Sequence, residues 1–395
     1  MKSNYKQLGQ FIRQVDVRNS EGKEENLLGV SIQKKFIPSI ANTVGTDFKK
    51  YKVVKKGQFT YIPDTSRRGD KIGIALLEDY EEGLVSNVYT VFEIIDEKQL
   101  IPEYLMLWFS RPEFDRYARF KSHGSVREIF DWNELCMVEL PVPDIEKQRK
   151  IVKAYKTITD RIALKQKIND NLVACIDTIF NEQFGNFKAL AESSTANTDF
   201  SSLPDGWTIE NAVHSFDISI GKTPPRSEPE WFTSNQTDNV WISIADMKTN
   251  SPFIFKSAEY LTNEAVKKHN VKIVPANSVL LSFKMTVGRV AIVTNEVTTN
   301  EAIAHFPCTK ENLFFVYCYL KNFNYGYLGS TSSITTAINS KIIKEMPFLM
   351  PSKKELDLFN HKVSGLFEQL KYISKELDIL EELSKMLLPQ LLGHC

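Results

Sequence analysis

The stretch that decides the fold is SKKELDLFNHKVSGLFEQLKYISKELDILEELSKMLLPQLL, residues 352–392. Read in alternating steps of four and three residues, it places apolar side chains at all but one position of a narrow seam. The seam positions are Phe359, Val363, Leu366, Leu370, Ile373, Leu377, Leu380, Ser384, Leu387 and Leu391. Such a repeat of 3.5 residues is typical of a helix that packs lengthwise against a partner helix. The pattern therefore predicts a long helix over residues 352–392.

A second stretch, residues 144–184, has the same repeat and supplies the partner helix. Its seam positions are Ile151, Tyr155, Ile158, Ile162, Lys165, Asn169, Leu172, Ile176 and Ile179, interrupted only by Lys165 and Asn169. At 1.5 Å per residue, each helix is expected to span roughly 60 Å. We predict that the two helices pair antiparallel, through a seam that includes Ile151, Ile158, Ile162, Leu172, Ile176, Leu366, Leu370, Ile373, Leu377 and Leu380. The alternative is that each helix belongs to the core of a separate domain.

Each long helix follows a globular half of mixed pattern. In the first half, β-branched and aromatic runs predict strands within residues 29–32, 52–54, 58–62, 72–77 and 88–94, and a helix is expected over Pro102–Phe120. The second half repeats this order about 200 residues later, with residues 274–283 matching 54–62, residues 288–292 matching 70–74, and a second helix over 313–327. The chain is therefore expected to be a duplicated α/β (α+β) protein with pseudo-two-fold symmetry, in which two globular domains are separated by an antiparallel coiled coil.

The expected domain boundaries follow from this repeat. They are 1–143 for the first globular domain, 144–184 for the first long helix, 185–202 for a linker, 203–351 for the second globular domain and 352–392 for the second long helix. The linker is expected because residues 188–202 are rich in Ala, Ser, Thr and Asn, a composition that suits an exposed connection.

The composition excludes several classes of protein. A length of 395 residues fits two domains, and there is neither a run of eighteen apolar residues nor a signal-peptide pattern after Met1, so we expect a cytoplasmic chain without membrane spans. The five cysteines are scattered without a C-x-x-C pair, which indicates neither a disulfide framework nor a zinc site. The net charge of zero does not by itself indicate nucleic-acid binding, but basic residues can still be concentrated on one surface.

The sequence lacks the motifs of several enzyme classes. Gly221-Lys222-Thr223 looks like the end of a phosphate-binding loop, but that loop needs Gly where Phe216 stands. Asp144 and Glu146 are crowded at a helix start, where acids are favoured for capping and dipole reasons rather than as a nuclease core. No Gly-rich dinucleotide motif follows a strand, and no catalytic residue or metal ligand is assigned. The prediction is that the chain is not itself an enzyme.

Basic residues with interleaved aromatic residues recur in both halves. In the first half they are Lys34, Lys35, Lys49, Lys50, Lys52, Lys55, Lys56, Arg67, Arg68 and Lys71, and in the second half they are Lys222, Arg226, Lys248, Lys267, Lys268, Lys272, Lys284 and Arg289. Lysine and arginine neutralise phosphates, and on loops that reach a groove they read base edges. The alternative is a solvated charged face, which is the commoner cause of a single charge run. Recurrence in both repeats favours nucleic acid.

The chain resembles the specificity subunit of type I restriction–modification systems. The resemblance rests on Leu203-Pro-Asp-Gly-Trp207, Ile220-Gly-Lys-Thr-Pro224, Val240-Trp-Ile-Ser-Ile244, Thr286-Val-Gly-Arg-Val-Ala-Ile292, Gly329-Ser-Thr331 and Pro143-Asp-Ile-Glu-Lys-Gln148, together with the repeat of globule and long helix. The first half lacks the Pro-x-Gly-Trp and Gly-Lys-Thr-Pro elements and resembles another variety of target-recognition domain, in Gly29-Val-Ser-Ile32 and Phe36-Ile-Pro-Ser39.

The resemblance implies a non-catalytic subunit that reads double-stranded DNA. Each target-recognition domain would read one half of a split sequence, and the paired helices would set the gap. By match to the motifs of the family, the candidates for DNA contact are Lys34, Lys35, Arg67, Arg68 and Lys71 in the first half, and Lys222, Thr223, Arg226, Lys284, Thr286 and Arg289 in the second. Two methyltransferase subunits and, in the full complex, motor-nuclease subunits would supply the chemistry that uses S-adenosylmethionine, ATP and magnesium, so no cofactor is expected on this chain. Two other functions stay open on the residues alone: a coiled-coil interaction scaffold without nucleic acid, and a self-contained DNA-modifying enzyme.

Overall fold

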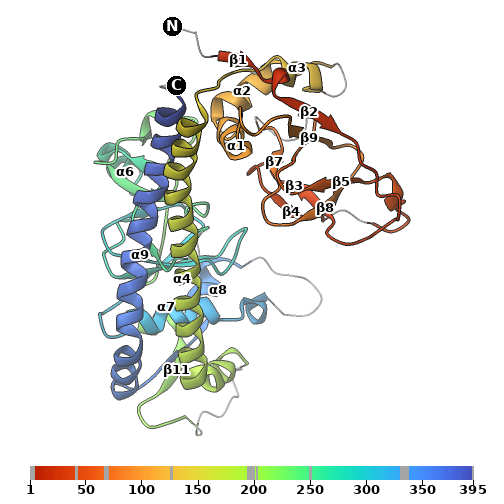
Figure 1. Ribbon diagram of the computed structural model, residues 1–395. Coiled ribbons are helices and arrows are strands. Elements are labelled where there is room, and N and C mark those ends of the chain that lie inside the picture. Colours follow the sequence, from red (N-terminus) through yellow and green to blue (C-terminus); the bar gives the residue numbers. More distant parts are fainter. Residues whose placement is uncertain are drawn as a thin grey trace. The chain divides into compact units, whose positions relative to one another are not determined.

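The computed structural model describes residues 5–40, 43–65, 71–124, 128–193, 201, 203–248, 251–329 and 338–393, and Figure 1 shows the course of the chain. It forms two compact units, Met1–Arg161 with Leu380–Cys395, and Ile162–Ile379. We call them the first unit and the second unit. Both long helices contribute to both units, because each helix crosses the boundary between them.

The first unit is built on a four-stranded antiparallel sheet of order β2-β9-β6-β7. Helices cover one face of it, and the rings of Phe59 and Phe92 stack with centroids 4.9 Å apart beneath Phe109. Strand pairs β3-β4, β5-β8 and β1-β10 complete the unit. Its elements are β1 (Tyr5–Gln7), η1 (Leu8–Gln10), β2 (Ile12–Val15), β3 (Leu28–Val30), β4 (Phe36–Pro38), η2 (Phe48–Lys50), β5 (Lys52–Lys55), β6 (Phe59–Tyr61), β7 (Ile74–Leu76), β8 (Glu82–Val85), β9 (Thr90–Ile94), α1 (Pro102–Phe109), α2 (Pro112–Phe120), α3 (Trp132–Cys136) and β10 (Glu139–Pro141).

The second unit is built on a five-stranded sheet of order β12-β20-β17-β18-β15, with a second sheet of order β13-β16-β14-β19 and the pair β11-β21. Helix α7 packs on the larger sheet and carries Phe315 into the core. Its elements are β11 (Thr208–Asn211), α5 (Ala212–Ser215), β12 (Ser219–Ile220), η3 (Pro229–Trp231), β13 (Phe232–Thr233), β14 (Asn239–Ile242), β15 (Phe253–Ile254), β16 (Glu259–Leu261), α6 (Asn263–Lys268), β17 (Ser278–Ser282), β18 (Val290–Val293), β19 (Thr298–Thr299), β20 (Ile303–Pro307), α7 (Leu313–Asn322), η4 (Tyr325–Gly329), α8 (Ser340–Lys344) and β21 (Pro347–Met350).

The two sheets confirm the predicted duplication. The order β2-β9-β6-β7 in the first unit has its counterpart in β12-β20-β17-β18 in the second, and in both units the order along the chain is the same. The pairs β1-β10 and β11-β21 also correspond, and each leads directly into a long helix. The loop between β6 and β7 therefore corresponds to the loop between β17 and β18.

The long helices are α4 (Ile145–Glu192) and α9 (Lys353–Gly393), and they pair antiparallel as predicted (Figure 1). In the first unit, the hydroxyls of Tyr155 and Ser384 lie 3.3 Å apart, and Ile151 packs in one cluster with Leu388 and Leu392. In the second unit, Gln183 near the end of α4 donates to the Glu355 carboxylate near the start of α9, over 3.0 Å. The chain direction is thus opposite in the two helices throughout.

The two polar residues of the first seam have specific places in the second unit. The Lys165 ammonium pairs with the Glu376 carboxylate of α9 at 2.7 Å, and Asn169 is 3% exposed. The apolar seam positions Ile176, Leu370 and Ile373 around them are buried. A buried polar residue in such a seam is a known means of fixing helix register.

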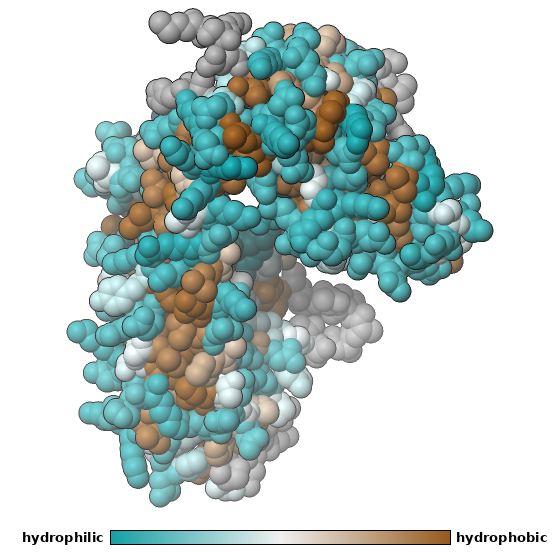
Figure 2. Space-filling view, viewed as in Figure 1, coloured by the Kyte–Doolittle hydropathy of each residue, from teal (hydrophilic) through white to brown (hydrophobic). Residues whose placement is uncertain are grey.

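Part of each long helix packs into the core of a globular unit and not only against the other long helix. In the second unit the Phe184 ring lies 4.9 Å from Phe315 of α7 and 5.3 Å from Phe359 of α9, centroid to centroid. Other positions of the two helices carry exposed apolar side chains, and Figure 2 shows hydrophobic residues at the surface along α4 and α9. The exposed large apolar residues of the two helices are Leu164, Ile168, Leu358, Tyr372, Ile379, Leu383 and Met386.

Three predicted boundaries are corrected. Helix α4 continues to Glu192, past the predicted end at residue 184, because Phe184 and Phe187 pack on Trp207 and an ion pair of 2.9 Å joins Lys188 to Glu192. The single helix expected over residues 102–120 is two helices, since Pro112 cannot continue a helix and begins α2 instead. The helix expected over 313–327 ends at Asn322.

Among the described residues, every helix is too short or too polar to cross a lipid bilayer.

Candidate nucleic-acid interface

Three loops meet at one end of the large sheet of the second unit. Strand β20 lies between β12 and β17, with Ile220 opposite Ala304 and Ser282 opposite Ile303. Because these neighbours are antiparallel to β20, the residues after β12, those after β17 and those before β20 come to the same end. We call residues 221–226, 283–289 and 299–302 the second-unit edge. This edge contains all the residues of the second half that are predicted to contact DNA.

Gly221 makes the close approach of two of these loops possible. A Cβ atom at this position would lie 2.1 Å from Thr299 Oγ1 and 2.2 Å from the Asn300 carbonyl oxygen, so only glycine fits. The Gly221 N–H donates to the Ile303 carbonyl (3.1 Å), and the Lys222 N–H donates to the Thr299 carbonyl (2.9 Å). The Gly-Lys-Thr sequence is therefore a tight turn tied by its backbone to the strand end, and the Lys222 side chain is exposed.

A carboxylate links the loops through side chains. The Thr223 hydroxyl donates to Glu301, a residue that sequence reasoning missed. Partial burial acts to raise the pKa of Glu301, but the hydrogen bonds from Thr223 and from its own backbone N–H, with the charges of Lys284 and Arg226, hold this pKa below its ordinary value. Glu301 is thus an anion at neutral pH, beside cations from both other loops.

Arg226 is held in a fixed plane rather than left free. Its guanidinium donates to both Glu259 carboxylate oxygens, at 2.7 and 2.8 Å, and lies 4.0 Å from the Phe232 ring centroid and 4.9 Å from that of Trp241. The hydrogen bond to Glu259 is the main cause that raises the pKa of Arg226. This bidentate pair and the two rings fix the orientation of the guanidinium, which is still half-exposed.

The loop between β17 and β18 presents its tip to solvent. The Ser282 hydroxyl donates to the Thr286 carbonyl (2.5 Å) and accepts from the Arg289 N–H (3.0 Å), so both ends of the loop are pinned. The Arg289 guanidinium donates to the Ile244 carbonyl (2.6 Å). Met285 at the tip is 98% exposed, and Lys284 beside it is also exposed. Lys284 is therefore presented outward, whereas Arg289 supports the loop.

A buried histidine holds the strand ends behind these loops. His305 of β20 is 0% exposed, with Nδ1 2.8 Å from Ser219 Oγ and Nε2 2.7 Å from Thr299 Oγ1. Both ring nitrogens of His305 therefore have a hydroxyl partner, Nδ1 on β12 and Nε2 on β19. Burial lowers the pKa of His305 to about 4. The only sequence signal for this role is a histidine inside an otherwise apolar strand.

In the first unit, the residues predicted for DNA contact have different surroundings. The Lys34 ammonium is enclosed, with its side chain 7% exposed: it pairs with Asp115 at 2.7 Å, donates to the Phe109 carbonyl and lies 5.3 Å from the Phe114 ring centroid. Burial is the main cause that lowers the pKa of Lys34. These contacts make Lys34 part of the packing between the β3-β4 hairpin and α2. Lys35 and Lys71 are exposed, whereas Arg67 and Arg68 lie outside the described residues.

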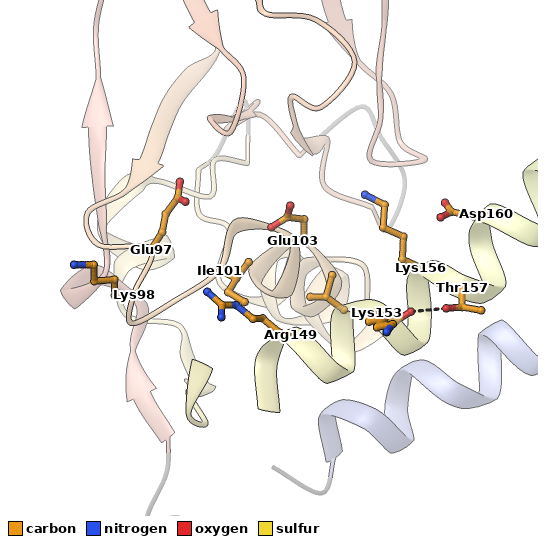
Figure 3. A pocket seen from close by; sticks show the side chains of 10 residues that line it. Glu97, Lys98, Ile101, Glu103, Arg149, Lys153, Lys156, Thr157 and Asp160 are labelled. Atoms are coloured by element: carbon orange, nitrogen blue, oxygen red, sulfur yellow. Dashed lines mark hydrogen bonds between the residues drawn. The ribbon is translucent and has the colours of Figure 1, made fainter. Parts of the chain in front are cut away.

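An open groove of the first unit lies between the loop after β9 and the first turns of α4 (Figure 3). It is lined by cations and acids in nearly equal number: Lys98, Arg149, Lys153 and Lys156, and Glu97, Glu103 and Asp160. This mixture does not favour a phosphate. In the part of the chain that the structure describes, no three His, Cys, Asp or Glu side chains are grouped to hold a metal ion.

The acids and the glutamine at the start of α4 have structural partners. The Asp144 carboxylate accepts from the Lys147 N–H (2.9 Å) and caps the helix. The buried Gln148 amide accepts from the Ile101 N–H (2.9 Å) and donates to the carbonyls of Gln99 and Pro143, each over 2.8 Å. Residues 143–148 therefore anchor the helix to the first unit.

Comparisons with known proteins agree with this architecture. The family model of the type I restriction modification DNA specificity domain matches residues 9–174 and 215–385. The type I restriction enzyme HindI specificity subunit of Haemophilus influenzae is 23% identical, over 98% of this chain and 98% of that protein. The type I restriction enzyme MjaIX specificity subunit of Methanocaldococcus jannaschii is 23% identical, over 75% of this chain and 70% of that protein.

A solved structure shows the same fold. The crystal structure of the S subunit of a type I restriction–modification system from M. genitalium covers 98% of this chain and 95% of its own, with a TM-score of 0.56 and 13% identity.

Proposed function

Because the chain belongs to the family of type I restriction modification DNA specificity domains, we propose that it reads a double-stranded DNA target in two halves, one through each globular unit. The observation that carries the proposal is the repeated sheet order, β2-β9-β6-β7 and β12-β20-β17-β18, each followed by a long helix. Two copies of one reading scaffold on one chain suit a split target.

We assign the readout of one half-site to the second-unit edge. Its loops carry the cations Lys222, Arg226 and Lys284, and Gly221 lets them gather at one strand end. Cations neutralise phosphates and give affinity, whereas loops that enter the major groove give sequence discrimination. The corresponding position in the first unit is the loop between β6 and β7, which contains Arg67, Arg68 and Lys71.

The paired helices are proposed to set the gap between the half-sites. At 1.5 Å per residue, α4 and α9, with 48 and 41 residues, have lengths of roughly 72 and 62 Å. Recognition elements that bind one face of DNA are spaced by whole turns of about 34–36 Å. The helices are therefore long enough to separate two readers by one to two turns.

The partners proposed for the chain are two methyltransferase subunits and, in the full complex, motor-nuclease subunits. Exposed apolar side chains on the long helices support a subunit interface, because apolar patches on a protein surface mark interaction sites. Leu164 and Ile168, one turn apart on α4 in the second unit, are such side chains. The chain itself is proposed to be non-catalytic and to bind no cofactor. S-adenosylmethionine, ATP and magnesium would be used by the partners, in the cytoplasm.

Co-expression with the methyltransferase subunit, followed by sequencing of methylated sites, tests the proposal. We expect a split motif with a fixed gap. Exchange of residues 1–143 for the corresponding domain of a relative should change one half of the motif and leave the other half and the gap unchanged. Intact complexes without DNA methylation or DNA binding would favour the scaffold, and methylation by the isolated chain would favour a self-contained enzyme.

A further inference from the structure

The second-unit edge contains a single acid among its basic residues. Lys222, Arg226, Lys284 and Arg289 are its cations, and Glu301 is its one carboxylate. Glu301 is exposed and lies on the short loop that joins β19 to β20, between the other two loops. An anion at this place opposes phosphate binding, so its presence needs a reason.

Glu301 is not required to hold the turn that it contacts. The backbone of that turn is tied to the strand end by the Gly221 and Lys222 N–H groups, which donate to the carbonyls of Ile303 and Thr299. The Thr223 hydroxyl adds one bond to Glu301 from the side. A structural role is therefore already filled by backbone atoms.

The surroundings of Glu301 suit an acceptor that faces a base edge. A carboxylate has about four acceptor positions, of which the Thr223 hydroxyl and its own backbone N–H use two. Lys284 and Arg226, on either neighbouring loop, offset its charge and can contact the flanking phosphates. The carboxylate is thus kept charged and oriented, with acceptor capacity to spare.

We propose that Glu301 determines specificity by accepting a hydrogen bond from the exocyclic amino group of a cytosine in the major groove of the half-site read by the second unit. Cytosine presents the N4 amino group as its major-groove donor, and Asp or Glu is its matching acceptor. Adenine also presents an amino group, but its N7 acceptor lies beside it and repels a carboxylate. This proposal rests on the proposed function, since it presumes that the second unit reads DNA.

The test sequences the methylated sites of complexes that contain the full chain with Glu301→Ala, Glu301→Gln or no substitution. The relevant half-site is the one left unchanged by the exchange of residues 1–143. We expect the unsubstituted chain to require cytosine at one position of it, and Glu301→Ala to reduce that discrimination by about 5- to 150-fold with other positions unchanged. Glu301→Gln should shift the preference toward adenine, because an amide matches N6 and N7 together.

Thr223→Val is the comparison variant. It removes the hydroxyl that donates to Glu301 and leaves the carboxylate in place. Because Thr223 only helps to orient the carboxylate, the cytosine requirement should weaken clearly less in this variant than in Glu301→Ala. If Thr223→Val reproduced the loss seen in Glu301→Ala, Glu301 would be a support for the turn and the proposal would be overturned.

The outcomes separate this inference from the proposed function. Equal weakening at every position, or an unchanged half-site in Glu301→Ala, would overturn the inference while the split motif of the unsubstituted chain stood. Absence of any split motif from the unsubstituted chain would overturn the proposed function itself. Equal subunit content of the purified complexes excludes misfolding as the cause of a change.

Discussion

Each unit has its own sheet with the same order of corresponding strands, but the two units differ in whether a lysine beside the sheet is exposed or buried. Lys284 follows β17 at the second-unit edge and extends into solvent, whereas Lys34 in the first unit is enclosed against α2 and paired with Asp115. Both residues lie in stretches that contain many lysines and arginines. This difference indicates that the duplicated sheet determines where the loops meet, and that the loops themselves determine which charged side chains are available to a ligand.

The arginine of the second-unit edge is an intermediate case. Arg226 is half-exposed, but Glu259 and two aromatic rings fix its plane. A guanidinium held in this way can meet a phosphate or a base without losing much side-chain freedom on binding. The chain thus contains enclosed, fixed and free cations. Substitutions of these three kinds of residue should change stability and DNA affinity to different extents.

The largest loss of stability is expected when the enclosed ion pair of Lys34 with Asp115 in the first unit is broken. Asp115→Asn leaves the Lys34 ammonium buried without its counter-charge, and breaking such a pair costs about 3–5 kcal/mol. The asparagine oxygen can still accept from the Ile72 N–H, which Asp115 accepts at 3.1 Å. Hydrogen exchange measured by mass spectrometry should show loss of protection in β7 and unchanged protection in β18, the corresponding strand of the second unit.

The double variant Lys34→Met with Asp115→Asn is the control for this prediction. It removes the charge and keeps the acceptor for Ile72, so most of the lost protection should return. A double variant as unstable as Asp115→Asn alone would show that the ion pair is not the source of the effect.

Much of the fold is predictable from local pattern, because local pattern reflects which face of an element is buried. The seams of α4 and α9 follow from apolar periodicity. Strands β6, β7, β9, β17 and β18 follow from β-branched and aromatic runs and from the repeat, whereas β2, β12 and β20 are not predicted by these patterns. Helix ends are harder, since the extension of α4 to Glu192 depends on Trp207, which is distant in sequence. Pro112 did signal the break between α1 and α2, and the helical pattern on both sides obscured it.

The candidate site is only partly predictable, for the same reason. Its loops could be named because their cations and turn residues are consecutive in sequence. The partners of those cations could not, since Asp115 is 81 positions from Lys34 and Glu259 is 33 positions from Arg226. Glu301 gave no local pattern, and His305 gave only that of a histidine inside an apolar strand, because their roles arise only when β20 lies between β12 and β17.

An intermediate loss of stability is expected at acidic pH, through His305 and in the second unit only. His305 is neutral in the folded protein with a pKa of about 4, against an ordinary value of 6.5. Its unfolded form binds a proton as pH falls below 6.5 while the folded form does not, so stability that is full above pH 6.5 decreases toward pH 4. At pH 5 the loss should be about 2 kcal/mol.

Urea unfolding at pH 7.5 and 5.0 measures this loss, with β17 and β6 followed separately by pulsed hydrogen exchange. The first unit serves as the internal control, since Phe92 lies in the core of its corresponding strand β9. In His305→Asn, the extra sensitivity of the second unit to acid should disappear. Equal pH dependence of the variant and the unsubstituted chain would contradict the assigned role of His305.

The smallest effect is expected from single cations on DNA affinity, and it tests the comparison of Lys284 with Lys34 directly. Lys284→Gln should weaken binding of all sequences alike and lower the slope of log affinity against log salt by about one, because one phosphate contact is lost. Lys34→Gln should leave that slope unchanged, since an enclosed ammonium paired with Asp115 releases no counterion on binding. Fluorescence anisotropy of a duplex target, titrated with the complete methyltransferase complex at several salt concentrations, measures both slopes. Equal reductions would show that the hairpin around Lys34 opens on DNA, and the distinction between enclosed and presented cations would then fail for the first unit.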